Sequence, residues 1–130
     1  MDWSRGELRA GLECYRGGQF FEAHEHWELV WLRLAEPEKS FLQALIQVSA
    51  AFHHRRRGND AGALSLMRRA LRRLERCPER FGGMAVERLR GGARAWLEAL
   101  EHGGAELPAS YPAMDPTAPG RTERGRAEEG

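Results

Sequence analysis

Two histidines and three glutamates lie in the aromatic stretch FFEAHEHWELVW, residues 20–31. At about 100° of rotation per residue, His24 falls on the same helical face as Trp27 and Trp31. Glu28 lies one turn beyond His24, so both side chains can reach one common point. Imidazole nitrogen and carboxylate oxygen are ligands for zinc, iron, manganese or nickel. The same pair can also be a hydrogen bond that holds one imidazole tautomer without a metal. The spacing therefore predicts either a metal site or a structural His–Glu pair.

A metal ion needs three or four ligands, so a further element must supply at least one more. The apolar segment 38–57 carries an unusual polar stripe, made of Gln43, Gln47, Ala50 and His54. Long buried amides need partners, and we expect this stripe to face the His24–Glu28 edge. His54 is the preferred third metal ligand, and the secondary candidates are Glu25, His53, Gln43 and Gln47. The alternative is that the glutamines face solvent and that both histidines belong to the basic end formed with residues 55–57.

The elements that position these side chains are helices. Apolar residues recur at helical spacing along most of the chain, and no convincing run alternates with period two. Glycine or proline stands at each junction, where it ends one helix or begins the next. These patterns predict an all-α fold with five helices, near residues 8–16, 20–35, 38–57, 60–76 and 84–102.

A weak internal repeat suggests how the helices are arranged. A shift of 40 residues places Gly18 on Gly58 and Ala23 on Ala63, and it aligns His24 with Leu64. Both copies read helix, glycine turn, helix. We therefore expect two stacked antiparallel helical hairpins plus a terminal helix, an arrangement similar to tetratricopeptide repeats. An imidazole in this arrangement takes the place of an interior leucine.

The composition changes after residue 104. Residues 105–130 hold four of the six prolines and few large apolar side chains. Such a segment buries too little surface to offset its ordering entropy. The expected organisation is a helical domain over residues 1–104 and a Pro/Gly-rich, disordered tail over 105–130, in which Tyr111 and its neighbours can lie on the domain.

Charge and composition exclude several classes of function. Twenty basic and nineteen acidic residues nearly cancel, which argues against nucleic acid as a partner. The arginine stripe of residues 68–76 is accordingly interpreted as a solvated face. No run approaches the roughly 20 apolar residues that cross a bilayer, and the N-terminus has no signal-peptide core. The prediction is a cytoplasmic protein without a membrane segment, in which Cys14 and Cys77 are free thiols and the partner is a second copy or another protein.

The stretch FFEAHEHWELVW, together with LIQVSAAFHHRRRGNDAGAL at residues 45–64, resembles a bacterial and archaeal family called domain of unknown function 309. That family's signature is a histidine, three residues, a glutamate, two residues, and then tryptophan or tyrosine. His24, Glu28 and Trp31 match it. The resemblance implies a helical fold, and it implies a suggested metal-binding role for the motif without implying an activity.

Two functions from different classes remain open for this uncharacterised small helical protein. The first is a metal-dependent hydrolase, in which a divalent ion on His24, Glu28 and one further ligand activates water and Glu25 acts as general base. The second is a non-catalytic, repeat-like interaction module, in which His24 and Glu28 are a structural pair.

Overall fold

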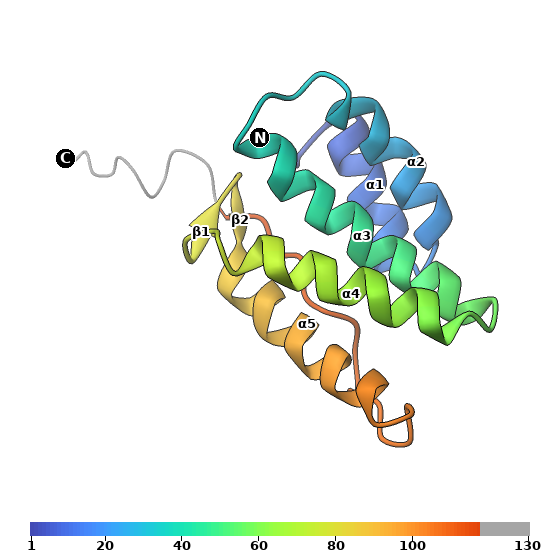
Figure 1. Ribbon diagram of the computed structural model, residues 1–130. Helices are drawn as coiled ribbons and strands as arrows, with labels where there is room; N and C mark the ends of the chain where they lie inside the picture. Colours follow the sequence, from blue (N-terminus) through green and yellow to red (C-terminus); the bar gives the residue numbers. More distant parts are fainter. Residues whose placement is uncertain (118–130) are drawn as a thin grey trace.

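The fold is built from helices. The computed structural model describes residues 1–117. These residues form five α-helices and one two-residue β-hairpin (Figure 1): α1 Gly6–Arg16, α2 Phe20–Trp31, α3 Glu38–Arg56, α4 Asp60–Leu74, β1 Arg80–Phe81, β2 Met84–Ala85 and α5 Val86–Glu101. The all-α prediction is confirmed, although α2 and α4 end a few residues earlier than periodicity alone indicates. No helix within residues 1–117 combines the length and apolarity that a bilayer crossing requires.

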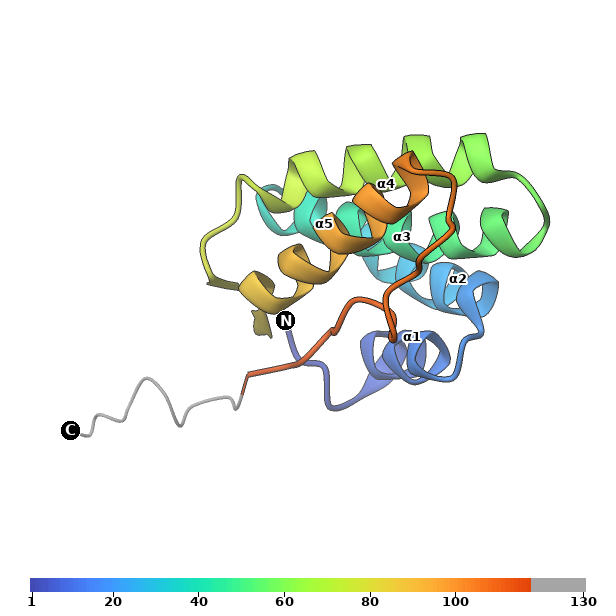
Figure 2. The same ribbon diagram turned by 90° about the horizontal axis from the view of Figure 1, so that it is seen from below.

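The helices stack as two antiparallel hairpins. α1 packs on α2, α2 on α3, α3 on α4 and α4 on α5, so each helix contacts its neighbours in the chain. Figures 1 and 2 show α1–α2 and α3–α4 as two layers, with α5 added against α4. The predicted arrangement of two hairpins plus a terminal helix is therefore confirmed.

The 40-residue repeat corresponds to two equivalent turns. Gly18 and Gly58 adopt φ values of 77° and 83°, a left-handed conformation that favours glycine. The residue after each glycine donates its N–H to a carbonyl five residues earlier, at 2.8 Å in both turns (Gln19 to Cys14, Asn59 to His54). This pattern satisfies helix-end carbonyls and starts the next helix two residues after the glycine. Identical turns thus give both hairpins the same geometry.

Trp27 is the centre of the α1–α2 layer. Its indole is fully buried, and its Nε1 donates to the carbonyl of Leu8 at 3.2 Å. The ring of Trp3 meets it edge-on, with centroids 6.0 Å apart. Trp96 is also buried, whereas Trp31 is only partly buried against the core. Three of the four tryptophans, Trp3, Trp27 and Trp96, are therefore core residues.

The short β-hairpin was not expected from the sequence. Gly82 and Gly83 adopt φ values of 60° and 77° and connect strands in which Arg80 pairs with Ala85 and Phe81 with Met84. A turn with two positive φ angles suits a tight hairpin. Two-residue strands are too short to show alternation, which explains why periodicity missed them.

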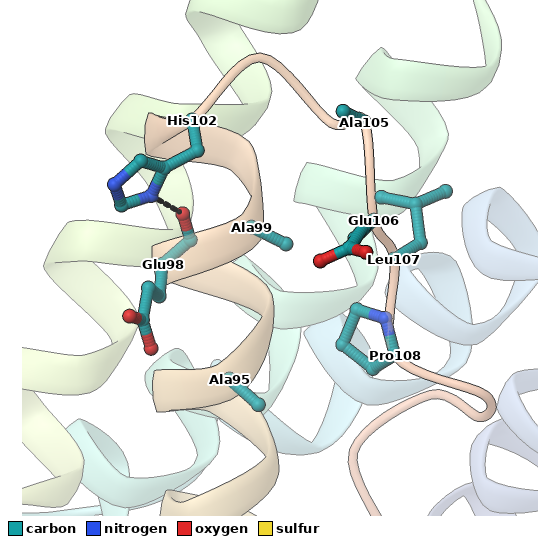
Figure 3. A pocket seen from close by; sticks show the side chains of 8 residues that line it. All are labelled: Ala95, Glu98, Ala99, His102, Ala105, Glu106, Leu107 and Pro108. Carbon is teal, nitrogen blue, oxygen red and sulfur yellow. Dashed lines mark hydrogen bonds between the residues drawn. The ribbon is translucent and has the colours of Figure 1, made fainter.

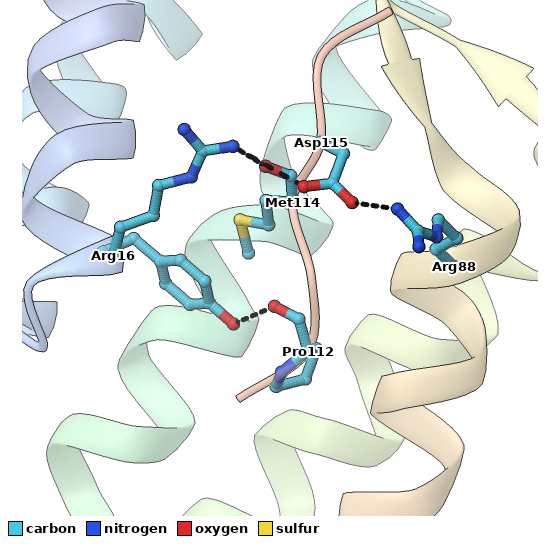
Figure 4. A network of polar contacts seen from close by, with 6 residues as sticks. Arg16, Arg88, Pro112, Met114 and Asp115 are labelled. Carbon is cyan, nitrogen blue, oxygen red and sulfur yellow. Dashed lines mark hydrogen bonds and ion pairs between the residues drawn. The ribbon is translucent and has the colours of Figure 1, made fainter. Parts of the chain in front are cut away.

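Residues 105–117 lie against the helices, although their composition indicated a disordered segment. Figure 2 shows this stretch crossing from the end of α5 towards α1. Tyr15 donates its hydroxyl to the carbonyl of Pro112 at 2.7 Å, and Met114 is buried. Asp115 is within 3.6 Å of Arg16 in α1 and 2.7 Å of Arg88 in α5 (Figure 4).

Residues 105–117 can be ordered without a core of their own, because α1 and α5 together provide the surface on which they are buried. The predicted boundary at residue 104 therefore does not mark the end of packed structure. The tail prediction for residues 118–130 lies outside the described residues.

Candidate functional site

α2 brings His24 and Glu28 to the same side of the helix. His24 Nε2 lies 3.7 Å from Glu28 Oε2, and the two side chains are 29% and 53% exposed. This separation is too long for a hydrogen bond, whose heavy atoms lie within about 3.2 Å. It is short enough for both atoms to contact one shared group. The predicted proximity is present, while the hydrogen bond of the structural interpretation is not formed.

Three histidines surround one small cavity between α2 and α3. His24, His53 and His54 line it together with Phe20, Phe21 and Ala50, and its volume is about 140 Å³. The ring centroid of Phe21 lies 5.2 Å from that of His53 and 6.2 Å from that of His24. The polar stripe of residues 43, 47, 50 and 54 therefore has its His54 end beside His24. This is the side on which we expected the stripe to lie.

A local hydrogen-bond chain determines which nitrogen of His54 carries a proton. Asn59 caps α4, because its Oδ1 accepts from the N–H of Gly62 at 2.9 Å. The Nδ2 amino group of Asn59 therefore faces Nδ1 of His54, at 3.1 Å. An amide NH₂ can only donate, so Nδ1 accepts and the neutral ring carries its proton on Nε2. His54 thus presents a donor through Nε2, which argues against it as the third metal ligand.

His53 is partly buried and lies against the ring of Phe21. Partial burial lowers its pKa from the ordinary value, and the positive charge of Arg57 acts in the same direction. A neutral imidazole is therefore favoured near pH 7. His53 is the better candidate for an acceptor or a ligand in this cavity.

The remaining candidate residues differ in how far they are buried. Gln47 is only 6% exposed, and its Oε1 has no hydrogen-bond partner within residues 1–117. Gln43 is half-buried, and Trp31 is covered by Lys39, whose Nζ lies 4.2 Å from the ring centroid. Glu25 is exposed on the outer side of α2, away from the cavity.

These residues do not converge into a metal centre. Within residues 1–117, no three His, Cys, Asp or Glu side chains are placed to hold one ion. His24 and Glu28 remain a two-residue polar pair next to an imidazole-lined cavity. Among the described residues, no third His, Cys, Asp or Glu side chain is placed beside them to complete such a group.

A larger hollow lies elsewhere. It has a volume of about 770 Å³ and is formed by the end of α5 and the segment after it (Figure 3). His102 donates through Nδ1 to the carbonyl of Glu98 in its own helix, at 2.8 Å. The hollow is wide and shallow, and His24 does not line it, so we do not place the site there.

Periodicity alone missed two features of α2. His26 does not line the cavity, and its Nδ1 instead lies 2.6 Å from Oε1 of Glu7 in α1. Phe21, Leu29 and Leu32 are 46%, 51% and 65% exposed, so α2 presents large apolar side chains to solvent. These residues are eight and three positions apart in the sequence. Buried residues of a helix recur at the same spacings, so the sequence alone did not distinguish this exposed face from the buried one.

Comparison with known proteins agrees with the resemblance in the α2 and α3 sequences. An uncharacterized protein of Aquifex aeolicus (strain VF5) is 32% identical over 94 residues, which cover 72% of this chain. The chain spans only 27% of that relative, so the matched region is there part of a longer protein. Residues 8–66, which run from within α1 through α2 and α3 into α4, match the family described as Domain of unknown function (DUF309). The resemblance is therefore confirmed over this region, which spans a little under half of the chain.

Proposed function

We propose that this protein is a non-catalytic interaction module that binds a basic amphipathic helix of another protein on the outer face of α2. The observation that carries the proposal is the distribution of exposed apolar side chains. Five large hydrophobic residues are exposed within residues 1–117, and three of them lie on or directly after α2 (Phe21, Leu29, Leu32). Scattered single residues need no explanation, whereas a set on one helix face indicates a binding surface.

The three side chains form one stripe. With Glu25 they fall within about 80° of each other on the helical wheel, and Phe21 and Leu32 are about 16 Å apart along the axis. We call Phe21, Glu25, Leu29 and Leu32 the α2 stripe. A partner helix of about three turns matches this length, and helices commonly dock through apolar residues at such spacing.

The charges beside the stripe select a basic partner. Glu22 and Glu28 flank it, and Glu25 lies within it. Glu22 and Glu25 form no ion pair within residues 1–117, and Glu28 has only His24. Lysine or arginine residues at the edges of a partner helix would meet these carboxylates. Such pairs contribute orientation and association rate more than affinity.

The test uses a synthetic amphipathic peptide of leucine and lysine, with a leucine–glutamate peptide of equal length as the control. We expect amide shifts confined to α2 and its flanks, and a Kd that rises about tenfold in the Leu29→Ser/Leu32→Ser variant. Leu107→Ser removes an exposed leucine outside the stripe and should leave the Kd unchanged. Equal binding of both peptides, or shifts elsewhere, would refute the proposal. A wild-type dimer that the double variant converts to a monomer would instead assign the stripe to contact between copies.

A divalent cation at His24 and Glu28 is a second candidate, which a specific distance favours. Two ligands at about 2.1 Å from a tetrahedral zinc ion lie about 3.4 Å apart. The observed 3.7 Å between His24 Nε2 and Glu28 Oε2 is close to this value. Because only two protein ligands are in place, water or a partner must complete the coordination, and binding should be weak.

This candidate predicts that added zinc, manganese or nickel raises the melting temperature of the wild type and that a chelator reverses the change. His24→Ala and Glu28→Gln should abolish the response. Glu25→Gln, which changes an exposed carboxylate one turn away, should retain it. An identical response in all four proteins would show that the metal binds elsewhere, and no response in any of them would leave the cation without support.

A further inference from the structure

A second cavity lies at the opposite end of α3 from the three histidines. It has a volume of about 230 Å³ and is enclosed by the start of α3, the end of α4 and β1, which meet at one end of the molecule (Figure 1). Phe81 is partly exposed and forms an aromatic wall, and the buried ring of Phe41 packs edge-on behind it, with ring centroids 5.4 Å apart. Arg73 and Arg76 are the basic residues of the lining.

The charges at this cavity are unbalanced. Glu36 is its carboxylate, and Ser40 holds it by donating from its backbone N–H at 3.0 Å. This contact and the Ser40 hydroxyl lower the pKa of Glu36, so it is ionised at neutral pH. Arg73 donates to the hydroxyl oxygen of Ser40 at 3.3 Å and so belongs to the same group. The side chain of Arg76 forms no ion pair or hydrogen bond within residues 1–117, so one positive charge at the cavity mouth has no partner there.

We propose that this cavity binds a small organic carboxylate with an aromatic body. Arg76 pairs with the carboxylate, because a guanidinium presents parallel N–H groups that match two carboxylate oxygens. The ring of the ligand lies on Phe81, which Phe41 holds in place, because offset or edge-on aromatic contacts are favourable there. A polar anion such as phosphate matches Arg76 but not the aromatic wall, and an uncharged aromatic compound matches only the wall.

Cys77 takes no chemical role in this proposal. Burial raises the pKa of its thiol, and the thiol donates to the carbonyl of Arg73 at 3.6 Å. A protonated, hydrogen-bonded thiol is a poor nucleophile. The cavity is therefore a binding site rather than a reactive one.

Titration with phenylacetate, followed by amide chemical shifts, tests the proposal. Phenylacetamide and inorganic phosphate are the two comparison ligands. We expect phenylacetate to bind with a Kd of about 1 mM or tighter, with shifts in residues 36–41 and 73–81, and each comparison ligand to bind at least about tenfold more weakly. Arg76→Gln should weaken phenylacetate about tenfold. Arg72→Gln removes an exposed arginine of α4 that does not line the cavity, and it should have no effect on phenylacetate binding.

Three outcomes would overturn this site. If phenylacetamide bound as tightly as phenylacetate, Arg76 would not contribute to recognition. If phosphate bound as tightly, the aromatic wall would not contribute. Absence of phenylacetate shifts at about 10 mM, tenfold above the expected Kd, would remove the site itself. Because Arg76 is exposed, its substitution should leave the melting temperature unchanged, and that measurement separates lost binding from lost folding.

Discussion

Gly11 lies where α1 packs directly against the indole of Trp27. A Cβ atom at this position would be 2.2 Å from Nε1 and 2.4 Å from Cδ1 of Trp27. Favourable contacts between such atoms need about 3.5 Å. In a Gly11→Ala variant the ring must therefore move away by about 1 Å, or the two helices must separate.

The surroundings of Trp27 resist that movement. Trp3 lies edge-on to the ring, and Tyr15 lies beside it with a centroid distance of 6.3 Å. A shift of the ring would also break the bond from Nε1 to the Leu8 carbonyl. Overpacking costs about 1–3 kcal/mol, and a buried N–H left unpaired costs about 1–3 kcal/mol. The better helix propensity of alanine returns about 1 kcal/mol. We expect a net loss of about 1–5 kcal/mol in the free energy of unfolding.

Urea unfolding followed by circular dichroism measures this loss. Gly91→Ala is the matched control, since a Cβ at this exposed position of α5 meets no atom within 4 Å. It should stabilise the protein by about 0.5–1 kcal/mol through helix propensity alone. The urea m-value should stay the same in both variants. A Gly11→Ala protein at least as stable as the wild type would refute the close packing of α1 on Trp27.

Three further predictions concern other parts of the chain. The Gly92→Ala variant should be less stable to urea unfolding than Gly91→Ala by about 1–3 kcal/mol, because its Cβ would lie 2.8 Å from the backbone of Pro112. Equal stabilities of the two variants would show that residues 105–117 do not pack on α5. Asn59→Ala should cost about 1 kcal/mol through loss of the α4 cap, and an unchanged melting curve would contradict that role. The lowered pKa of His53 makes the folded protein bind a proton less readily than the unfolded chain. Its contribution to stability should be complete above the unfolded pKa of about 6.5 and should fall as the pH drops through the lowered folded pKa. His53→Gln should flatten this part of the melting temperature–pH curve, and an unchanged slope would show that another group is responsible.

Much of the fold was predictable because helices and their ends depend on nearby residues. The 3.6-residue period showed which face of α2 is buried, and it placed His24 and Glu28 together. Gly18 and Gly58 ended their helices because the turn needs a positive φ, a requirement that belongs to the residue itself. The family resemblance rested on the same local stretches of α2 and α3.

The composition of the site depended on the tertiary structure. Periodicity assigns a side chain to a face of its own helix, but it does not fix how the neighbouring helix is rotated or where it crosses. His53 and His54 therefore join His24 at one cavity only because α3 crosses α2 near Ala50. His54 was the preferred ligand by spacing, yet the cap that Asn59 makes on α4 turns its Nε2 into a donor.

The segment after α5 shows the same limit most clearly. Its prolines and few apolar residues indicated a disordered tail, because a short polar segment cannot form a core. Tyr15, Arg16 and Arg88 nevertheless hold residues 112–115 across the gap between α1 and α5. These helices are about 80 residues apart in the chain, and no local pattern encodes their distance. The sequence by itself determined which elements form and which faces they bury, whereas only the tertiary structure decided which side chains meet, because that depends on how the helices pack in three dimensions.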